Sequence, residues 1–485
     1  MTGSLTANCN QCRLEPVAPV EFDYDLLVIG SGPAGQRAAI QAAKINKRVA
    51  IAEKKTVVGG VCINLGTIPS KTLREAVIYL SGYRMKDVYG SSYTLKERIT
   101  HQDLLFRVDY VVKHEIEVIR NQLRRNGIDL FSAEASFVDQ HSIQLNFVDG
   151  SGQRKVTARH IIIAAGTHST RDAHIPFDGK RVLTSDDIFT LDRLPKTLAV
   201  IGGGVIGCEY ASIFATLGVR VTLIEKSPRL LSFIDKEIID SFAYHLNEQR
   251  VQLRLGEAVK SIDCGDGSDA EKVRITLESG KQIVTEKALY CIGRTGATDE
   301  LNLASVDLAP DDRGRLKVNE NYQTPQANIY AVGDVIGFPS LASTSMEQGR
   351  VAACHAFGVS IRSVPALFPY GIYTIPEIST CGLNEEELTA QGVPYEVGKA
   401  QYKEIARGQI LGDHHGLLKL IFHLETHKLL GVHIIGEGAS ELVHIGQTVM
   451  AFSGEVNYFV NTVFNYPTLA ECYKTAAFDG LNRIS

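Results

Sequence analysis

Two segments of the chain share one alternation of apolar strand, glycine-rich turn, apolar helix and second apolar strand. Residues 23–54 read "DYDLLVIGSGPAGQRAAIQAAKINKRVAIAEK", and residues 197–226 read "TLAVIGGGVIGCEYASIFATLGVRVTLIEK". Short continuous apolar runs that alternate with helices are typical of parallel strands buried on both faces. The pattern therefore predicts two copies of one strand–turn–helix–strand unit.

Each unit carries three glycines and one acid at matching positions. The glycines are Gly30, Gly32 and Gly35 in the first unit and Gly202, Gly204 and Gly207 in the second, and the acids are Glu53 and Glu225. The first glycine permits a tight turn, the second lets a pyrophosphate approach the backbone, and the third lets the helix pack on the strand. The helix N-terminus attracts phosphate and the acid can accept hydrogen bonds from a ribose. The sequence therefore predicts two dinucleotide sites, with Pro33, Ala34, Val205 and Ile206 at the helix starts as further candidate contacts.

The rest of the chain supplies supporting elements. Apolar positions in residues 104–123 repeat with helical spacing, which predicts a packed helix. An apolar strand at residues 160–163 runs towards Gly166. Another precedes Gly333 and Asp334, a carboxylate at a strand end that a surface turn would explain equally well. After about residue 365 the pattern predicts a hairpin and a helix, an α+β arrangement without nucleotide fingerprints.

Composition indicates a globular protein of several domains. The 485 residues suggest about three domains, and 44% are hydrophobic and 22% charged. A net charge of −5 and a pI near 6.3 argue against a nucleic-acid binder. The longest apolar region contains Glu209, Arg220 and an internal glycine turn, so we expect no membrane span.

Cysteine use and the N-terminus indicate a cytoplasmic protein. Residues 1–20 lack the basic start and apolar core of a signal peptide, so we expect a loose tail. The nine cysteines have no regular spacing, as in a reducing compartment. Cys9 and Cys12 could bind zinc or undergo redox cycling, but no second pair or nearby histidine completes a tetrahedral site. His414, His415 and the later histidines show no grouping with acids or cysteines in the sequence, so no metal site is predicted.

The stretch from Gly59 to Lys71, "GGVCINLGTIPSK", resembles the redox-active segment of the flavoprotein disulfide reductases. Together with the two glycine fingerprints and the Gly333-Asp334 segment, the resemblance covers nearly the whole chain from Tyr24. It implies two Rossmann-like α/β domains, for FAD and for NAD(P), followed by a C-terminal α+β interface domain. The implied ranges are 21–175 with 297–362 for FAD, 176–296 for NAD(P) and 363–485 for the interface. A homodimer or larger homo-oligomer, with active-site contributions across subunits, follows from the same resemblance.

The resemblance also implies roles for individual residues. Asp334 would contact the ribitol of FAD, and Glu53 the adenosine ribose. Lys71 would lie near the flavin N5, paired with Glu209, where a cation stabilises the negative charge that builds as hydride arrives. An ordinary interdomain ion pair is the alternative for that pair, and one pair can serve both purposes. The remaining candidate cofactor-binding residues are Lys54, Gly60, Cys62, Thr67, Gly166, Gly333, Lys226, Arg229, Gly293, Arg294 and Tyr466.

Two positions depart from the family pattern. The family has a second cysteine five residues after the first and a histidine before Pro-Thr, whereas Thr67 and Tyr466 stand at those places. Cys62 alone cannot form the internal disulfide, because exchange needs an attacking and a resolving sulfur. A phenol with a pKa near ~10 is also a poor base for a thiol. Cys472 could replace the missing sulfur only within the narrow geometry of a disulfide, which we do not expect.

A flavin that accepts hydride but has no disulfide to reduce needs another acceptor. The simplest one is a second nicotinamide nucleotide, so the predicted reaction is reversible, energy-independent transhydrogenation from NADPH to NAD+, ping-pong through FAD. The segments "CIGRTGATD", "GIYTIPEIS" and "YFVNTVFNYPT" resemble family members with this activity. Three alternatives stay open: a dihydrolipoamide dehydrogenase-like reductase that uses an unseen thiol, an NAD(P)H oxidase or diaphorase, and a nucleotide-sensing protein.

The acid of the second unit raises a question of specificity. Glu225 is expected to favour NAD through its 2′-OH and to repel the 2′-phosphate of NADP. Lys226 and Arg229 lie close enough in the sequence to offset that charge, unless they are only solvated surface residues.

Overall fold

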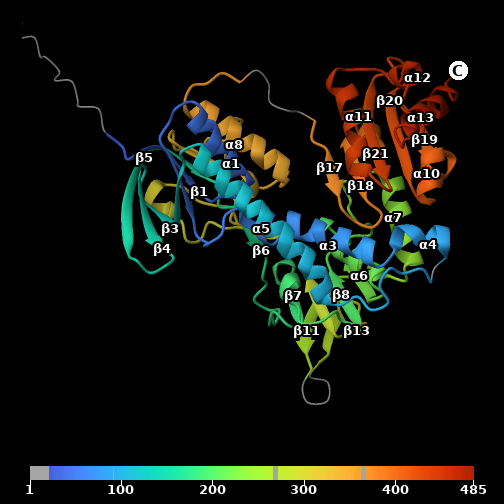
Figure 1. Cartoon of the computed structure of the whole chain (residues 1–485), viewed down its shortest axis with the longest axis horizontal. Coiled ribbons are helices and arrows are strands. Elements are labelled where there is room, and N and C mark those ends of the chain that lie inside the picture. Colours follow the sequence, from blue (N-terminus) through green and yellow to red (C-terminus); the bar gives the residue numbers. More distant parts are fainter. Residues whose placement is uncertain (1–20, 91, 266–270, 362–366, 485) are drawn as a thin grey trace, which may run out of the picture.

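The computed structural model describes residues 21–90, 92–265, 271–361 and 367–484, so Cys9 and Cys12 lie outside the described residues. Three units built on separate sheets lie next to one another (Figure 1), with the C-terminal unit in orange and red. Two α/β units and a C-terminal α+β unit confirm the predicted fold class.

The first unit is a parallel sheet with an antiparallel extension. Its strands are β1 Tyr24–Ile29, β2 Val49–Glu53, β3 Asp129–Asp139, β4 Ser142–Phe147, β5 Gln153–Ile163 and β16 Ile329–Ala331. Strands β3, β2, β1, β5 and β16 are parallel neighbours in that order, and β4 pairs antiparallel with β3 and β5. Because β16 joins the sheet from far along the chain, the turn that follows it reaches the same carboxyl edge as the first glycine turn.

Helices cover this sheet and extend towards the second unit. They are α1 Pro33–Lys44, α2 Gly60–Asn64, α3 Thr67–Leu80, α4 Tyr83–Tyr89, α5 His101–Arg125 and α8 Ala342–Ala356, with the 3-10 turns η3 Leu303–Val306 and η4 Gly333–Ile336. Helix α5 confirms the helix predicted for residues 104–123 and begins at a capping box of Thr100 and Asp103. Helix α8 lies along α1 (Figure 1), so close that a Cβ on Gly349 would come within 2.1 Å of the Ala34 carbonyl oxygen.

The second unit repeats the parallel order of the first. Its elements are β7 Val182–Thr184, η1 Ser185–Thr190, β8 Thr197–Ile201, α6 Val205–Thr216, β9 Arg220–Glu225, α7 Lys236–Glu248, β10 Gln252–Leu255, β11 Val259–Cys264, β12 Val273–Leu277, β13 Gln282–Thr285 and β14 Lys287–Tyr290. Strands β10, β9, β8, β14 and β7 are parallel neighbours in that order, and β11–β13 form an antiparallel sheet. An antiparallel pair of β6 Thr167–Ser169 and β15 Arg294–Gly296 connects the first two units.

The C-terminal unit is an antiparallel sheet with helices. Its elements are β17 Tyr370–Ile372, β18 Ile378–Gly382, α9 Glu385–Gln391, β19 Tyr395–Gln401, η5 Tyr402–Glu404, α10 Ala406–Leu411, β20 Leu417–His423, β21 Leu429–Ile435, α11 Ala439–Ala451, α12 Asn457–Asn461 and α13 Glu471–Leu481. The strand order is β17-β18-β21-β20-β19. The β20–β21 hairpin and helix α11 confirm the elements predicted after residue 365.

The apolar runs of the sequence are buried as their pattern predicts. Strand β2 is buried along its whole length, and β1 and β8 are buried except at one position each. Within the described ranges, no helix combines the length and apolar content needed to cross a bilayer. The strands of the three units fall inside the three predicted domain ranges, whose boundaries stay a prediction.

Candidate functional site

The first glycine-rich turn joins β1 to α1 with little room for side chains. Gly30 has a φ of +104°, and a Cβ there would lie 2.3 Å from the Ala164 carbonyl oxygen. A Cβ on Gly35 would lie 2.0 Å from the Gly30 carbonyl oxygen. Gly32, in contrast, has nothing within 4 Å of where its Cβ would be, and it caps α1 without a side-chain hydrogen bond. The space beside Gly32 at the start of α1 is therefore open, and the first N–H groups of a helix are the donors that a phosphate site uses.

Glu53 is tied to this turn by hydrogen bonds. Its Oε2 accepts from the Ser31 backbone N–H at 3.0 Å and from the Ser31 hydroxyl at 2.6 Å, and its Oε1 accepts from the Lys55 N–H at 3.0 Å. The Ser31 hydroxyl oxygen also accepts from the Gly59 N–H at 3.0 Å. Ser31 thus joins the turn, the acid and the start of the segment that leads to Lys71.

The second turn has the same backbone geometry. Gly202 has a φ of +108°, and a Cβ on Gly207 would lie 1.8 Å from the Gly202 carbonyl oxygen. Gly204 has nothing within 4 Å of where its Cβ would be, in front of Val205 and Ile206. The repeat that the sequence predicts is therefore a repeat in three dimensions.

Glu225 is held by two backbone N–H groups and by the side chain of Ser227. Its Oε2 accepts from the Gly203 N–H at 2.6 Å and its Oε1 from the Ser227 N–H at 2.7 Å. Burial raises the pKa of this carboxyl, but the hydrogen bonds from Gly203 and Ser227 and the charge of Lys226 together lower it below its ordinary value. Glu225 is therefore ionised at neutral pH and presents a negative charge beside the second turn.

Cys62 faces a hydroxyl where the family pattern has a second sulfur. It lies in α2, with Thr67 at the start of α3 as its hydrogen-bond partner. Burial is the largest influence and raises the pKa of the Cys62 thiol, although Thr67 and Lys71 pull it down. The thiol is therefore protonated at neutral pH, and the described cysteines form no disulfide. Cys472 is fully buried in the core of the C-terminal unit.

Lys71 and Glu209 meet where all three units converge. The Lys71 Nζ lies 2.8 and 2.7 Å from the two carboxylate oxygens of Glu209. Glu209 Oε1 also accepts from the Tyr373 backbone N–H at 2.9 Å, and the Lys71 ammonium lies 5.1 Å from the centroid of the Tyr373 ring. The Glu209 side chain is 5% exposed and that of Lys71 23%. The pair is therefore a largely desolvated, oriented charge with one open side.

Asp334 lies in the short η4 turn after β16. Burial raises the pKa of its carboxyl, opposed by the positive charges of Arg294 and Arg315 and by a hydrogen bond from Ser345. The neighbouring Gly333 N–H donates to the Gln348 side chain at 2.8 Å, which fixes the turn against α8. The negative charge of Asp334 also raises the pKa of the Cys62 thiol, which indicates that the two side chains lie near each other.

Three predicted basic residues of the second unit have different surroundings. Arg229 pairs with Glu386 of the C-terminal unit, with an N–O distance of 2.7 Å. Lys226 is exposed. Arg294 donates to the Thr167 hydroxyl at 2.8 Å and to the Thr167 carbonyl at 2.9 Å, which fixes it at the β6–β15 connection. Of these three residues, Lys226 is the one whose charge acts on Glu225, while Arg229 and Arg294 are engaged with other partners.

The remaining predicted residues lie on turns or at the surface. Gly60 lies against the first turn, since its Cβ would come 3.0 Å from the Gly32 Cα. Gly166 and Gly293 both have positive φ values, +70° and +85°. Lys54 pairs with Glu300 at 3.0 Å. Tyr466 is 74% exposed.

Two residues of the candidate site, Ser31 and Tyr373, were not predicted from the sequence. Ser31 occupies a variable position of the first glycine motif, so the motif does not single it out. Only the structure shows that its hydroxyl contacts Glu53 and Gly59. Tyr373 lies in the quoted segment "GIYTIPEIS", but only the fold brings its backbone N–H to Glu209.

Family models identify the class of protein. Residues 24–349 match the pyridine nucleotide-disulphide oxidoreductase model, and residues 368–477 match the dimerisation domain of the same class. The chain belongs to the pyridine nucleotide-disulphide oxidoreductase family.

Individual relatives narrow the class. The soluble pyridine nucleotide transhydrogenase of Mycobacterium bovis (strain BCG / Pasteur 1173P2) is 51% identical over 462 residues, 95% of this chain and 98% of the relative. That of Colwellia psychrerythraea is 45% identical over 96% of this chain and 99% of its own length. Among solved structures, the HOCl-induced flavoprotein disulfide reductase RclA from Escherichia coli has a TM-score of 0.83 at 27% identity, covering 94% of this chain and 99% of its own. LpdA from Mycobacterium tuberculosis has a TM-score of 0.85 at 26% identity, covering 93% and 99%.

Proposed function

We propose that the protein is an FAD-dependent transhydrogenase that transfers hydride from NADPH to NAD+, reversibly and without an energy source. Relatives that are 45–51% identical over nearly the whole chain are named soluble pyridine nucleotide transhydrogenase, and members of the family bind FAD. In the proposed ping-pong sequence, FAD when bound accepts hydride from one nucleotide and returns it to the other.

The first unit has features that fit FAD. The open N-terminus of α1 suits a pyrophosphate, and the Glu53 carboxylate, which is 6% exposed, suits a ribose diol. The half-buried Asp334 carboxylate has one side-chain hydrogen bond, from Ser345, and suits the hydroxyls of a ribitol chain. These residues would bind and orient the cofactor, with Gly60 and Gly333 allowing close approach of the backbone.

In this proposal the Lys71–Glu209 pair acts as a fixed charge at the site of hydride transfer. Glu209 holds the Lys71 ammonium through both carboxylate oxygens, and the Tyr373 N–H holds Glu209 in turn. A cation oriented in advance in a water-poor site stabilises developing negative charge without reorganisation. The same pair also joins the units, so its structural and chemical roles coincide.

The observation that carries the proposal is the Cys62–Thr67 contact. A hydroxyl replaces the resolving sulfur, and the buried thiol keeps a raised pKa. Thiol–disulfide exchange needs a thiolate and a second sulfur, so this pair supports the absence of a disulfide relay. With Tyr466 at the place of the family's base, the route that remains is from nucleotide to nucleotide.

Acceptance of both nucleotides requires relief of the Glu225 charge. Arg229 lies four residues beyond Glu225 and is engaged with Glu386 in a partly exposed pair. Since exposed ion pairs contribute about 0–1 kcal/mol, a 2′-phosphate can compete for the Arg229 guanidinium. We propose that Arg229, with Lys226, accommodates NADPH in this way.

The assembly and location belong to the same proposal. The match of residues 368–477 to a dimerisation domain supports a homodimer or larger homo-oligomer. We propose that Tyr466 reaches the partner's active site across that interface and that the enzyme works in the cytoplasm. Its predicted partners are the two nucleotides, with neither nucleic acid nor membrane.

Anaerobic rapid mixing tests the proposal directly. Holoenzyme mixed with NADPH should lose its oxidised flavin absorbance, and NAD+ added next should restore it completely. If NAD+ fails to restore the oxidised spectrum, the proposal is wrong. Faster recovery with oxygen or quinone than with NAD+ would favour an oxidase or diaphorase, and lipoamide reduction that disappears in Cys62→Ser would favour a disulfide reductase.

A further inference from the structure

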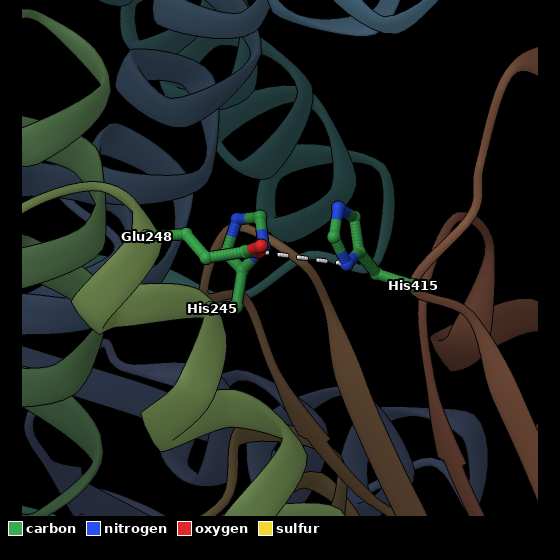
Figure 2. Close-up of side chains that lie close together, drawn as sticks. All are labelled: His245, Glu248 and His415. Atoms are coloured by element: carbon green, nitrogen blue, oxygen red, sulfur yellow. Dashed lines mark ion pairs between the residues drawn. The ribbon is translucent and has the colours of Figure 1, made fainter.

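A histidine–carboxylate cluster lies where the second unit meets the C-terminal unit, away from Lys71 and Glu209. His245 and Glu248 come from the last turn of α7, and His415 from the segment before β20; the three side chains point towards one another (Figure 2). The Glu248 Oε2 lies 3.8 Å from His245 Nδ1 and 3.7 Å from His415 Nδ1. One ligand atom from each residue lies within 4.8 Å of the other two.

His245 is buried with one ring nitrogen unpartnered. The residue is 6% exposed, and among the described residues its Nδ1 has no hydrogen-bond partner. Its Nε2 lies 2.9 Å from the Tyr83 hydroxyl and 2.9 Å from the Gln249 side-chain nitrogen. Burial, helped by the charge of His415, lowers the pKa of His245 to about 4, so the imidazole is neutral at pH 7.

The neighbouring amide indicates which tautomer satisfies the cluster. Gln249 Oε1 is also buried without a partner among the described residues. A 180° rotation of that amide, which exchanges its oxygen and nitrogen, lets His245 Nε2–H donate to Oε1. Nδ1 then carries a lone pair and faces the Glu248 carboxylate. A cation between Nδ1 and the carboxylate would satisfy both acceptors, whereas in the opposite tautomer an Nδ1–H would face Glu248 Oε2 at 3.8 Å, too far for a hydrogen bond.

A second acidic cluster, at the start of α7, differs because it contains a cationic side chain. Asp235, Glu237 and Glu385 also converge at this junction, but the Lys419 ammonium lies among them, 2.9 Å from Asp235 and 3.2 Å from Glu237. That cluster therefore carries its own cation. Across the described ranges, Glu248 is paired with no lysine or arginine.

We propose that His245, Glu248 and His415 bind a divalent d-block cation of the Zn²⁺ class and thereby join α7 to the C-terminal unit. Two imidazoles and one carboxylate suit Zn²⁺, whereas Mg²⁺ and Ca²⁺ prefer oxygen ligands alone. Tetrahedral ligands about 2.0–2.1 Å from zinc lie ~3.3 Å apart, so the two Glu248 contacts need to shorten by about 0.5 Å and the widest separation in the cluster by up to ~1.5 Å. Glu248, whose side chain is 42% exposed, and His415, 32% exposed, can make that movement and leave a fourth position for water.

The chain also supplies the hydrogen bonds that would orient the ligands. Asp413 Oδ1 accepts from the His415 backbone N–H at 3.1 Å and from the Gly416 N–H at 2.8 Å, which fixes the segment that carries His415. Tyr83, from α4 of the first unit, contacts the far nitrogen of His245. A cation here therefore links elements of all three units.

Zinc titration of the chelator-treated holoenzyme by calorimetry tests the site. The wild type should bind one Zn²⁺ per chain with micromolar or tighter affinity. His415→Gln and Glu248→Gln should each weaken binding about 10- to 100-fold, the range found when metal-site contacts are lost. His414→Gln removes the adjacent exposed histidine and should leave the affinity unchanged, so it is the matched control.

Two further measurements keep the test decisive. Flavin content and far-UV circular dichroism verify that each variant is folded, and zinc should raise the melting temperature of the wild type and of His414→Gln but not of His415→Gln. X-ray absorption at the zinc edge should show only N/O ligands near ~2.0–2.1 Å. A sulfur at about 2.3 Å would assign the metal to a cysteine and overturn the proposal. Millimolar-only binding, or equal affinity in all variants, would overturn it as well.

Discussion

The acid that ends the second strand is held differently in the two nucleotide-binding units. Glu53 accepts three hydrogen bonds, one of them from the Ser31 hydroxyl, and is 6% exposed. Glu225 accepts from the backbone N–H groups of Gly203 and Ser227 and from the Ser227 side chain, but its turn supplies no hydroxyl, because Gly203 stands where the first unit has Ser31. A side chain at Gly203 would meet Leu230 at 2.6 Å, so the second unit has no space for such a hydroxyl.

The segments that pack beside the two nucleotide-binding units also differ. Helix α8 lies on α1, and the turn after β16 brings the half-buried Asp334 to the first unit. The second unit instead has the partly exposed Arg229–Glu386 pair in the segment that follows β9. One backbone therefore supports two kinds of site: the first is closed by distant segments and suits a retained cofactor, and the second suits nucleotides that exchange.

Adding a methyl group to the third glycine of each unit should have the largest effect. In Gly35→Ala and Gly207→Ala the new Cβ lies within about 2 Å of a carbonyl oxygen, which should weaken the local structure by ~3 kcal/mol, about 100-fold in affinity. Gly35→Ala should be purified largely without flavin. Gly207→Ala should keep its flavin but lose reduction by NADPH. The flavin-to-protein absorbance ratio and stopped-flow reduction measure the two losses, and equal flavin loss in both variants would remove the proposed distinction.

Removal of the Glu209 charge, which joins the units through Lys71, should have the second-largest effect. Glu209→Gln keeps a hydrogen-bonding side chain but no longer orients the Lys71 ammonium by charge, so flavin reduction should slow by about 10²-fold. Binding of NADPH should change much less, because the nucleotide contacts lie elsewhere. Single-turnover kinetics separate the two effects. Glu237→Gln, which removes a carboxylate of another interdomain pair, is the control and should reduce normally.

The Ser31 hydroxyl is the largest chemical difference between the two turns. Ser31→Ala removes donors and acceptors for Glu53 and Gly59, which should cost about 1–2 kcal/mol. Dissociation of FAD should therefore speed up by ~10-fold, while the KM for NADPH stays the same. Fluorescence of released flavin measures the rate. A variant that retains FAD as firmly as the wild type would show that the hydroxyl is only structural.

Nucleotide preference should depend on Arg229. Arg229→Ala should raise the KM for NADPH about 3- to 10-fold and leave that for NADH nearly unchanged, because only NADPH carries a 2′-phosphate. Arg220→Ala removes the same charge at the opposite end of β9 and is the matched control. An equal rise in KM for both nucleotides would contradict a role of Arg229 in binding the 2′-phosphate.

The pH dependence of that preference follows from Glu225. Its pKa is lowered in the folded protein, so its stabilising hydrogen bonds are fully present above the ordinary carboxyl pKa and are lost as the pH falls through the lowered value. The NADPH/NADH preference should therefore be flat from about pH 6 to 9, because the pKa of the Glu225 carboxyl lies below its ordinary range. A step near neutral pH would point to another group.

Cys62→Ser should have the smallest effect. The thiol already has a raised pKa and a hydroxyl neighbour, so serine changes little and hydride transfer should stay within about twofold of the wild type. Steady-state transhydrogenation measures this. A large loss would mean that the sulfur has a chemical role in the first unit.

The sequence determined the repeated units because their information is local. Apolar runs, glycines and a terminal acid lie within one strand–turn–helix–strand segment, so the parallel sheets and both turns, including Gly35 against Gly30, could be predicted. The substitution of Thr67 for a second cysteine was equally visible, since it lies within one short motif.

Contacts between segments distant in sequence were decided only by the tertiary structure. Tyr373 reaches Glu209, Arg229 reaches Glu386, and His415 reaches His245 across more than 150 residues of chain, and no periodicity links such positions. The cluster of His245, Glu248 and His415 has no signature in the sequence for the same reason. Burial, too, is a property of the packed units: it raises the pKa of Cys62 and lowers that of His245, and neither shift follows from neighbours in the sequence.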